Sequence, residues 1–207
     1  REERIPISAI HFGSGYTTRE DLRYVFTWNR EKFPDVKSMF GKLKEMGLHT
    51  MANTKPVLLT DHPAYQETTK AGALIKDADG KPAIGRFWDA DGSYLDFTSE
   101  AGINWWKTNA RKTVLDAGFD SIWNDNNETE IWDDEATVDG FGTQTLAKHT
   151  RPLHSLLMTR ATFETTLDKA PKNRPYTVTR AGCVGLQRYA ETWTGDNFTR
   201  WHTLKWN

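Results

Sequence analysis

The alternation of apolar runs with helical patterns constrains the fold of this chain more than any other feature of its sequence. Four short apolar runs are each followed by a loop or turn, as buried strands commonly are. Between them lie longer stretches whose apolar residues recur with the spacing of one helix face. Strands that alternate with helices of this length predict parallel βα units. The predicted strands cover residues 5–12, 48–59, 119–123 and 176–179, and the predicted helices cover about 34–47, 98–118 and 144–169.

Local signals set the boundaries of the predicted helices. Pro34 stands where a first-turn proline belongs in the first helix, and Gly47 is placed to end that helix. Thr98 is placed to cap the second helix, and Gly118 to end it. Pro152 predicts a break or kink in the third helix, because proline lacks the N–H that a helix interior requires.

The region between the second strand and the second helix is predicted to be an insertion. Residues 60–96 are too rich in glycine, proline and aspartate to favour a helix. Within them, residues 77–80 have the sequence Asp-Ala-Asp-Gly, which is typical of the turn of a small hairpin. We therefore expect a loop with a hairpin at about 60–96.

Two large architectures are built from parallel βα units: an open, doubly wound sheet and a (β/α)8 barrel. The glycine-rich phosphate-binding patterns of open sheets are absent from the sequence. Polar and aromatic residues follow the predicted strands, which is where a barrel carries its active site. We expect residues 1–207 to be a partial (β/α)8 TIM barrel of the α/β class, with about four of its βα units. About half of the strands of a complete barrel are missing, and neither end of the sequence becomes polar as a domain boundary commonly does. We therefore expect a segment of a longer chain.

Composition excludes several classes of partner. The 27 basic and 28 acidic residues give a net charge of −1, so neither a nucleic acid nor an anionic membrane is an expected partner. No run approaches the roughly 18 apolar residues that span a bilayer. Cys183 is the only cysteine, which excludes an intrachain disulfide and a zinc site built from cysteine clusters. The compartment stays open, with the cytoplasm slightly favoured by the scarcity of cysteine.

Tryptophan is the residue type that points to a function. The chain has nine tryptophans, and two of them stand close to aspartates after predicted strands. Trp123 precedes Asp125 by two positions, and Trp193 precedes Asp196 by three. Two carboxylates are the minimum apparatus for cleaving a glycosidic bond, and indole faces stack on the apolar faces of sugar rings. These residues predict a saccharide pocket.

Other interpretations of the same residues remain open at this point. Aspartate and asparagine after a strand are common turn formers and helix caps. The acidic run that begins at Asp125 could bind calcium, but the EF-hand pattern requires glycine at its sixth position, where this chain has Glu130. The six histidines lack the spacing of metal ligands. We expect no metal and no cofactor.

The sequence resembles glycoside hydrolase family 31, the α-glucosidase and α-xylosidase family, in several stretches that occur in the family's order. Residues 123–128, Trp-Asn-Asp-Asn-Asn-Glu, are similar to the signature Trp-x-Asp-Met-Asn-Glu. Residues 26–29, Phe-Thr-Trp-Asn, resemble Phe-Thr-Trp-Asp, and residues 95–98 with Trp105-Trp106 resemble the Asp-Phe-Thr…Trp-Trp block. Residues 193–197 resemble the segment that carries the family's second carboxylate. These stretches extend over nearly the whole chain.

The resemblance implies a retaining hydrolase that removes a terminal α-linked sugar through a covalent glycosyl-enzyme. It implies Asp125 as the nucleophile and Asp196 as the general acid/base. An arginine beside Asp125 would keep that carboxylate ionised, and the second carboxyl, if less solvated, could stay protonated near neutral pH. In a retaining enzyme the two carboxyl groups are about 5–5.5 Å apart.

The resemblance also implies which residues bind the sugar. Arg180 would hold the nucleophile and the sugar hydroxyls, and Trp88, Trp123 and Trp193 would form the walls of the terminal sugar's subsite. Asn126 stands where the family has methionine and would add a polar group to the wall. The first predicted strand ends without the carboxylate that commonly grips glucose in the family, so α-xylosides and α-galactosides remain alternative substrates.

Two further functions stay open beside hydrolysis. A non-catalytic saccharide-binding module would keep the aromatic pocket, and a transglycosylase would pass the sugar to an acceptor other than water. The expected partners are an oligosaccharide or glycoside substrate and the remainder of the barrel or further domains. For the 207 residues alone, open strand edges and half a pocket predict aggregation rather than activity.

Overall fold

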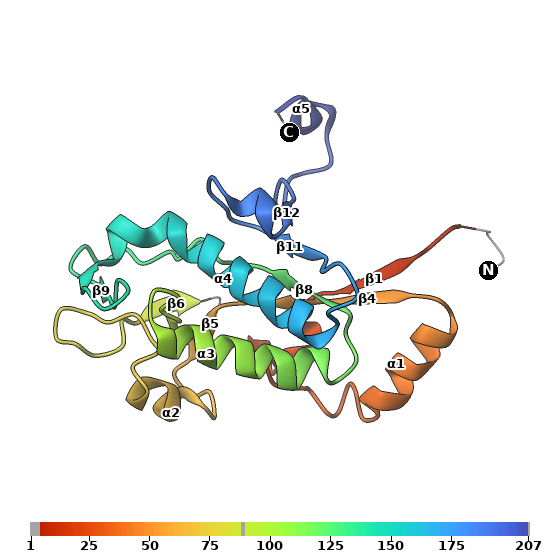
Figure 1. The fold of residues 1–207 in the computed structure, drawn as a ribbon, viewed down its shortest axis with the longest axis horizontal. Coiled ribbons are helices and arrows are strands. Elements are labelled where there is room, and N and C mark those ends of the chain that lie inside the picture. Colours follow the sequence, from red (N-terminus) through yellow and green to blue (C-terminus); the bar gives the residue numbers. More distant parts are fainter. Residues whose placement is uncertain (1–4, 88–89, 207) are drawn as a thin grey trace.

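The central sheet of the protein is parallel and follows the order of the chain. The computed structural model describes residues 5–87 and 90–206. In it, each strand of the sheet pairs with the next one along the sequence (Figure 1). A doubly wound sheet reverses its strand order at a switch point, whereas a barrel does not. The predicted partial barrel is therefore confirmed. The five strands are β1 (Ala9–Phe12), β4 (His49–Thr54), β8 (Ser121–Asn124), β11 (Thr177–Thr179) and β12 (Glu191–Thr192).

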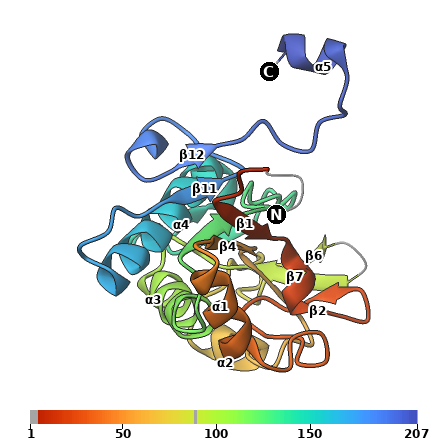
Figure 2. The same ribbon diagram turned by 90° about the vertical axis from the view of Figure 1, so that its right-hand side faces the viewer.

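Three main helices lie on the same side of this sheet (Figure 2). The first begins after Asp35, whose side chain accepts a hydrogen bond from the Ser38 N–H at 2.9 Å, so Pro34 precedes the cap rather than starting the helix. The second is capped by Ser99 and not by Thr98, because the Ser99 hydroxyl reaches the N–H three residues ahead. The helices are α1 (Val36–Glu45), α3 (Glu100–Asn109), which continues as a π-helical turn over Ala110–Leu115, and α4 (Ala147–Lys169).

Of the break or kink predicted at Pro152, the break is wrong, because α4 continues through this residue, while the kink stays a prediction. Pro152 is close to the start of the helix, and the carbonyl that it leaves without a helical partner belongs to Lys148 in the first turn. A proline this close to a helix start removes one hydrogen bond and leaves the following turns intact. The Ser155 hydroxyl donates to the Pro152 carbonyl at 2.9 Å, which adds a contact at this point.

Two further predictions, the strand at 48–59 and the helix-free loop at 60–96, are wrong in part. The predicted strand 48–59 is two strands, because Pro56 has no N–H with which to continue the ladder: β4 ends before it and β5 (Val57–Leu59) joins a different sheet. The predicted loop contains a short helix, α2 (Tyr65–Lys70), in a stretch free of glycine, proline and aspartate. The turn at 77–80 does form, with Lys76 bridged to Pro82.

The segment between β4 and α3, where an insertion was predicted, and the other loops contain the remaining strands. Figure 1 shows this segment toward the left of the view, at the end of the sheet toward which the parallel strands run. Strand β5 pairs with β7, and β7 with β6, in a three-stranded antiparallel sheet. These and the shorter antiparallel pairs are β6 (Gly85–Phe87), β7 (Ala90–Tyr94), β2 (Thr18–Arg19) with β3 (Leu22–Arg23), and β9 (Thr137–Val138) with β10 (Thr145–Leu146).

An aromatic cluster joins α1 to the sheet. Trp28 stacks on Phe119 with ring centroids 5.8 Å apart, and Phe40 of α1 meets the same Phe119 ring edge-on at 4.7 Å. Phe12 of β1 contacts Phe40 and Phe119. Trp106 of α3 is completely buried in the same core. The main core therefore lies between the helices and the sheet.

The C-terminal part of the described chain lies outside this core. Helix α5 (Trp201–Trp206) has no buried residue, and both views show it apart from the rest of the fold (Figures 1 and 2). Its Trp201 and Trp206 side chains are exposed. In the described residues, no helix combines the length and apolar character needed to cross a membrane.

Candidate active site

The register of the sheet brings four functional candidates into one row. The last residues of β4, β8, β11 and β12 are aligned with one another across the sheet. The ladder extends one step further, because the Asp125 N–H donates to the Thr54 carbonyl at 3.0 Å and the Arg180 N–H donates to the Asn124 carbonyl at 2.9 Å. The residues that follow the four strands are therefore neighbours at the carboxyl end of the sheet: Lys55, Asp125, Arg180 and Trp193.

Asp125 is held firmly at the centre of this row. Its Oδ2 atom accepts hydrogen bonds from Asn53 Nδ2 at 2.9 Å and from Lys55 Nζ. Its Oδ1 atom accepts the Asn126 backbone N–H at 2.9 Å and lies 3.5 Å from Arg180 Nη1. Only 10% of the Asp125 side chain is exposed. The carboxylate is thus fixed from both strands that flank β8.

Lys55 and Asp125 form a buried ion pair. Burial by itself raises the pKa of Asp125, but the Lys55 ammonium, the Asn53 amide and the Asn126 N–H together hold this pKa below its usual value. Burial lowers the pKa of Lys55, and the negative charge of Asp125 opposes that effect. Asp125 is therefore an ionised carboxylate at neutral pH, as a nucleophile must be.

Arg180 joins the two predicted catalytic carboxylates. Its Nη1 atom is 3.5 Å from Asp125 Oδ1 and 3.5 Å from Asp196 Oδ2, so those two oxygens are at most twice that distance apart. Its Nε atom contacts Glu128 Oε1 at 2.8 Å. Burial lowers the pKa of Arg180, but the three carboxylates outweigh it and raise that pKa. The Asp196 side chain is 80% exposed, so the sheltered position expected for an acid/base is not present in this chain.

The aromatic and amide candidates fall around the same row. Trp123 and Trp193 meet nearly at right angles, with ring centroids 5.1 Å apart. The Trp123 Nε1–H is buried and has no acceptor among the described residues. Asn126 has a left-handed backbone, with φ of 48°, and its Oδ1 accepts from Lys55 at 2.6 Å. The polar group that Asn126 adds is thus engaged by Lys55. Trp88 lies outside the described residues.

Sequence reasoning missed the amides that support the site. Asn124 is fully buried, and its side chain donates to Thr159 Oγ1 at 3.2 Å and accepts from Thr162 Oγ1 at 3.0 Å. Asn127 donates to Thr179 Oγ1 at 2.9 Å and accepts the Ala181 N–H at 3.0 Å. The signal that could have revealed these roles was the group of asparagines at the end of an apolar strand. Amides in such a place become buried, and a buried amide needs hydrogen-bond partners from neighbouring elements.

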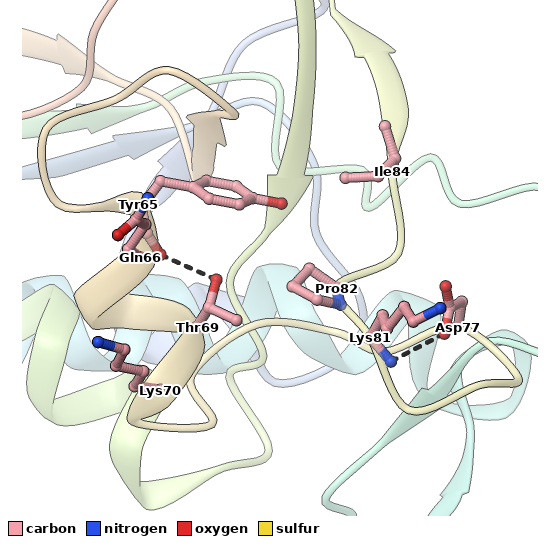
Figure 3. Close-up of a pocket in the computed structure, with 8 residues that line it drawn as sticks. All are labelled: Tyr65, Gln66, Thr69, Lys70, Asp77, Lys81, Pro82 and Ile84. Atoms are coloured by element: carbon pink, nitrogen blue, oxygen red, sulfur yellow. Dashed lines mark hydrogen bonds between the residues drawn. The ribbon is translucent and has the colours of Figure 1, made fainter.

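A cavity with a volume of about 480 Å³ lies away from this row, between α2 and the segment around the 77–80 turn (Figure 3). Tyr65 and Thr69 line one side, where the Thr69 hydroxyl donates to the Tyr65 carbonyl at 2.8 Å. Lys81 and Asp77 line the other, joined at 2.9 Å from the Lys81 N–H to Asp77 Oδ1. The cavity contains none of the candidate site residues.

Across residues 5–87 and 90–206, no group of three or more histidine, cysteine, aspartate or glutamate side chains is arranged to hold a metal ion. The calcium interpretation of the acidic run that begins at Asp125 gains nothing from this geometry. Lys55 and Arg180 supply positive charge beside Asp125.

Curated relatives are similar to nearly the whole chain. It is 29% identical over 216 residues to Alpha-glucosidase 2 of Bacillus thermoamyloliquefaciens, with 99% of this chain and 26% of that protein covered. It is 30% identical over 213 residues to Glucosidase 2 subunit alpha of Saccharomyces cerevisiae, with 97% of this chain and 22% of that protein covered. The chain thus spans about a quarter of the length of these relatives.

Solved structures agree with the fold. The ER glucosidase II heterodimeric complex contains a chain with a TM-score of 0.85 and 25% identity, with 99% of this chain and 23% of that chain covered. A Flavobacterium johnsoniae family 31 dextranase complexed with glucose has a TM-score of 0.80 and 24% identity, with 95% of this chain and 24% of that chain covered, and supports the fold alone. The model of the glycosyl hydrolases family 31 TIM-barrel domain matches residues 1–207. This chain therefore belongs to glycoside hydrolase family 31 and is part of that family's TIM-barrel domain.

Proposed function

We propose that this chain carries the catalytic centre of a retaining α-glycosidase that removes a terminal α-linked sugar. The observation that carries the proposal is the buried, ionised Asp125 at the end of β8, joined through Arg180 to Asp196. The curated relatives described above are named as α-glucosidases or glucosidase subunits, which supports an α-glucoside as the first substrate to test.

The reaction takes place in two steps. In the first, Asp125 attacks the anomeric carbon, the bond from that carbon to the leaving oxygen breaks, and Asp196 gives its proton to that oxygen. In the second, water attacks the anomeric carbon, Asp196 takes a proton from the water, and the ester bond to Asp125 breaks. Each step inverts the anomeric carbon, so the product keeps the α configuration.

The residues around Asp125 orient the sugar. Arg180 binds sugar hydroxyls as well as Asp125, while Trp123 and Trp193 present indole surfaces to the ring. Trp88 is the third proposed wall. Strand β1 ends at Phe12 and places no carboxylate beside the row, so the sugar has to be identified by experiment.

Paired variants on the complete polypeptide test this function. Aryl α-glucoside, α-xyloside and α-galactoside are assayed with the parent, and NMR of the first product is expected to show the α anomer. Asp125→Ala is expected to lower kcat roughly 10⁴-fold or more, because the nucleophile is lost. Asp120→Ala is the matched control, since Asp120 precedes β8 at its opposite end, where its Oδ2 accepts a hydrogen bond from the Thr50 N–H at 2.9 Å. Turnover that survives the loss of Asp125 contradicts the mechanism.

Azide separates the roles of the two carboxylates. In Asp125→Ala, azide takes the place of the nucleophile and is expected to yield the β-glycosyl azide. In Asp196→Ala, azide attacks the glycosyl-enzyme in place of water and is expected to yield the α-glycosyl azide. The same product from both variants would refute the assignment of roles. Acceptor sugars added to the parent measure how much of the intermediate undergoes transglycosylation.

A non-catalytic saccharide-binding module is the second candidate. The observation that favours it is the 80% exposure of Asp196, which lacks the shelter of an acid/base in this chain. This alternative predicts that the complete polypeptide binds α-glycosides and turns over none of them. Calorimetry beside the kinetic assay distinguishes the two functions.

A further inference from the structure

The two oxygens of Asp125 have different surroundings. Oδ2 accepts hydrogen bonds from two side chains of the β4 end, Asn53 at 2.9 Å and Lys55. Oδ1 accepts the adjacent Asn126 N–H at 2.9 Å and has Arg180 at 3.5 Å. The β4 side therefore restrains Oδ2, while Oδ1 faces the longer contact to Arg180.

Lys55 is built into the site rather than attached to its surface. Its side chain is only 10% exposed, and the register of β4 and β8 places it directly beside Asp125. The same ammonium donates to Asn126 Oδ1 at 2.6 Å, so it also fixes the residue after the nucleophile. A buried ammonium with a hydrogen-bonded carboxylate has a defined position, because moving it would leave a buried charge without its partner.

We propose that Lys55 is a positioning residue that holds Asp125 through Oδ2, leaves Oδ1 to bond to the anomeric carbon, and stabilises the carboxylate as it leaves the sugar. This inference rests on the proposed function, in which Asp125 is the nucleophile. It assigns a different role to each carboxylate oxygen.

Charge changes during the two steps explain why Lys55 acts mainly in the second. When the Oδ1–C1 bond forms, Asp125 becomes a neutral ester, and the Lys55 ammonium faces the ester carbonyl oxygen Oδ2. When water attacks C1, the C1–Oδ1 bond breaks and its electron pair returns to the carboxylate, beside the ammonium. Lys55 therefore makes Asp125 a weaker nucleophile and a better leaving group. Its loss slows deglycosylation more than glycosylation.

Several other charged and titratable groups surround Lys55 and Asp125 and contribute to how their ionisation depends on pH. Arg23 of β3 and Arg180 after β11 repel the Lys55 charge. Glu128 and Asp196 face Arg180 from its other sides. Tyr16, in the turn after β1, donates its hydroxyl to the Asn53 carbonyl at 3.0 Å. None of these groups bonds to Asp125 Oδ2 in the described residues, so the direct effect on this oxygen comes from Lys55 and Asn53.

Transient kinetics of Lys55→Met on the complete polypeptide test the inference. With an aryl α-glycoside that has a good leaving group, kcat is expected to fall about 10- to 100-fold, because a charge-assisted hydrogen bond is lost. KM falls with kcat and a burst of aglycone appears, because the glycosyl-enzyme accumulates. The acid limb of kcat/KM moves to higher pH, because removing the ammonium lets the pKa of Asp125 rise.

Two further variants keep the test decisive. Lys55→Gln retains a hydrogen-bond donor without the charge, and it is expected to give the burst and the shifted acid limb even if Lys55→Met fails to fold. Lys55→Arg keeps the charge and is expected to recover part of kcat and the parent acid limb. Lys107→Met is the matched control, because Lys107 forms an ion pair with Glu164 between α3 and α4, away from the strand ends. It is expected to leave the kinetics unchanged.

The outcomes separate this inference from the proposed function. A parent that turns over no glycoside overturns both. A parent that turns over glycosides overturns the inference alone if Lys55→Gln lowers kcat and kcat/KM equally, shows no burst and keeps the parent acid limb. That pattern would mean that Lys55 has a purely structural role.

Discussion

Single hydroxyl groups connect the site to the helices behind it. The Thr162 hydroxyl donates to Asn124 Oδ1 at 3.0 Å and accepts from Trp106 Nε1 at 2.9 Å. All three side chains are completely buried. One hydroxyl thus satisfies two buried polar groups, one at the end of β8, directly before the proposed nucleophile, and one in the core. The position of Asn124, the residue before Asp125, depends on this contact.

Thr162→Val tests this connection. Valine keeps the shape of threonine but removes the partner of Asn124 Oδ1 and of Trp106 Nε1, so the free energy of unfolding is expected to fall by about 1–3 kcal/mol. Thr165→Val is the matched control on the same helix, because the Thr165 hydroxyl bonds to the Ala161 carbonyl of its own helix at 2.7 Å. Urea titrations measure both variants. Equal losses would show that Thr162 has no special role.

At the residue scale, the sequence predicted the charges of the site better than their partners. Asp125, Asp196 and Arg180 could be predicted because they follow a strand or match a family motif, and the structure places Arg180 between the two aspartates. The partnership of Lys55 with Asp125 could not, since it joins positions 70 residues apart and depends on the register of two strands. Sequence spacing carries no information about register across a sheet.

At the element scale, two glycines in helices occupy opposite environments. A Cβ atom on Gly102 of α3 would be 2.0 Å from the Asp96 carbonyl oxygen. That approach lets α3 start directly against the loop that follows β7. A Cβ atom on Gly41 of α1 would meet nothing within 4 Å. Glycine is therefore required for packing in α3 and is replaceable in α1.

Alanine at these two positions should change stability in opposite directions. Gly102→Ala forces backbone apart and is expected to lower the free energy of unfolding by about 1–3 kcal/mol. Gly41→Ala restricts the unfolded chain without a clash and is expected to raise that free energy by about 0.5–1 kcal/mol. Both values follow from chemical denaturation. A loss at Gly41 as large as that at Gly102 would refute the packing argument.

Element prediction succeeded where one signal dominated and failed where two competed. The strand at 176–179 and the helix that ends before Gly47 had clear boundaries, and both are confirmed within a residue or two. The helix α2 was missed because averaging over 60–96 hid a six-residue stretch without breakers. A break or kink was predicted at Pro152 because the sequence pattern began the helix at about 144, which placed the proline further from the helix start than it is.

At the scale of the whole molecule, the sheet has two outer edges. Among the described residues, β1 pairs only with β4, and β12 pairs only with β11. Exposed apolar side chains lie on α5, where Trp201 is 88% exposed and Leu204 67%. Unpaired edges and exposed apolar side chains both favour association with other chains.

The 207-residue chain in isolation is therefore expected to associate with its own copies. Sedimentation velocity at increasing concentration should show species larger than the monomer well below about 100 μM. Replacing Trp201 and Leu204 by glutamate should weaken the association, because it removes apolar surface and adds charge. Glutamate at Lys172, an exposed position before β11, is the control for added charge alone. A monomer at all concentrations would contradict this expectation.

The agreement between sheet order and chain order has a consequence for how the protein is made. On the ribosome, each strand of the sheet emerges after the strand it will lie beside, so every new strand finds a partner that has already been synthesised. The pairing of β4 with β8 waits longest, because residues 55–120 must first be translated, and the contact of Lys55 with Asp125 forms only with that pairing. The Lys55 ammonium therefore stays hydrated until β8 pairs with β4, and it is buried only when Asp125, the proposed nucleophile, lies beside it.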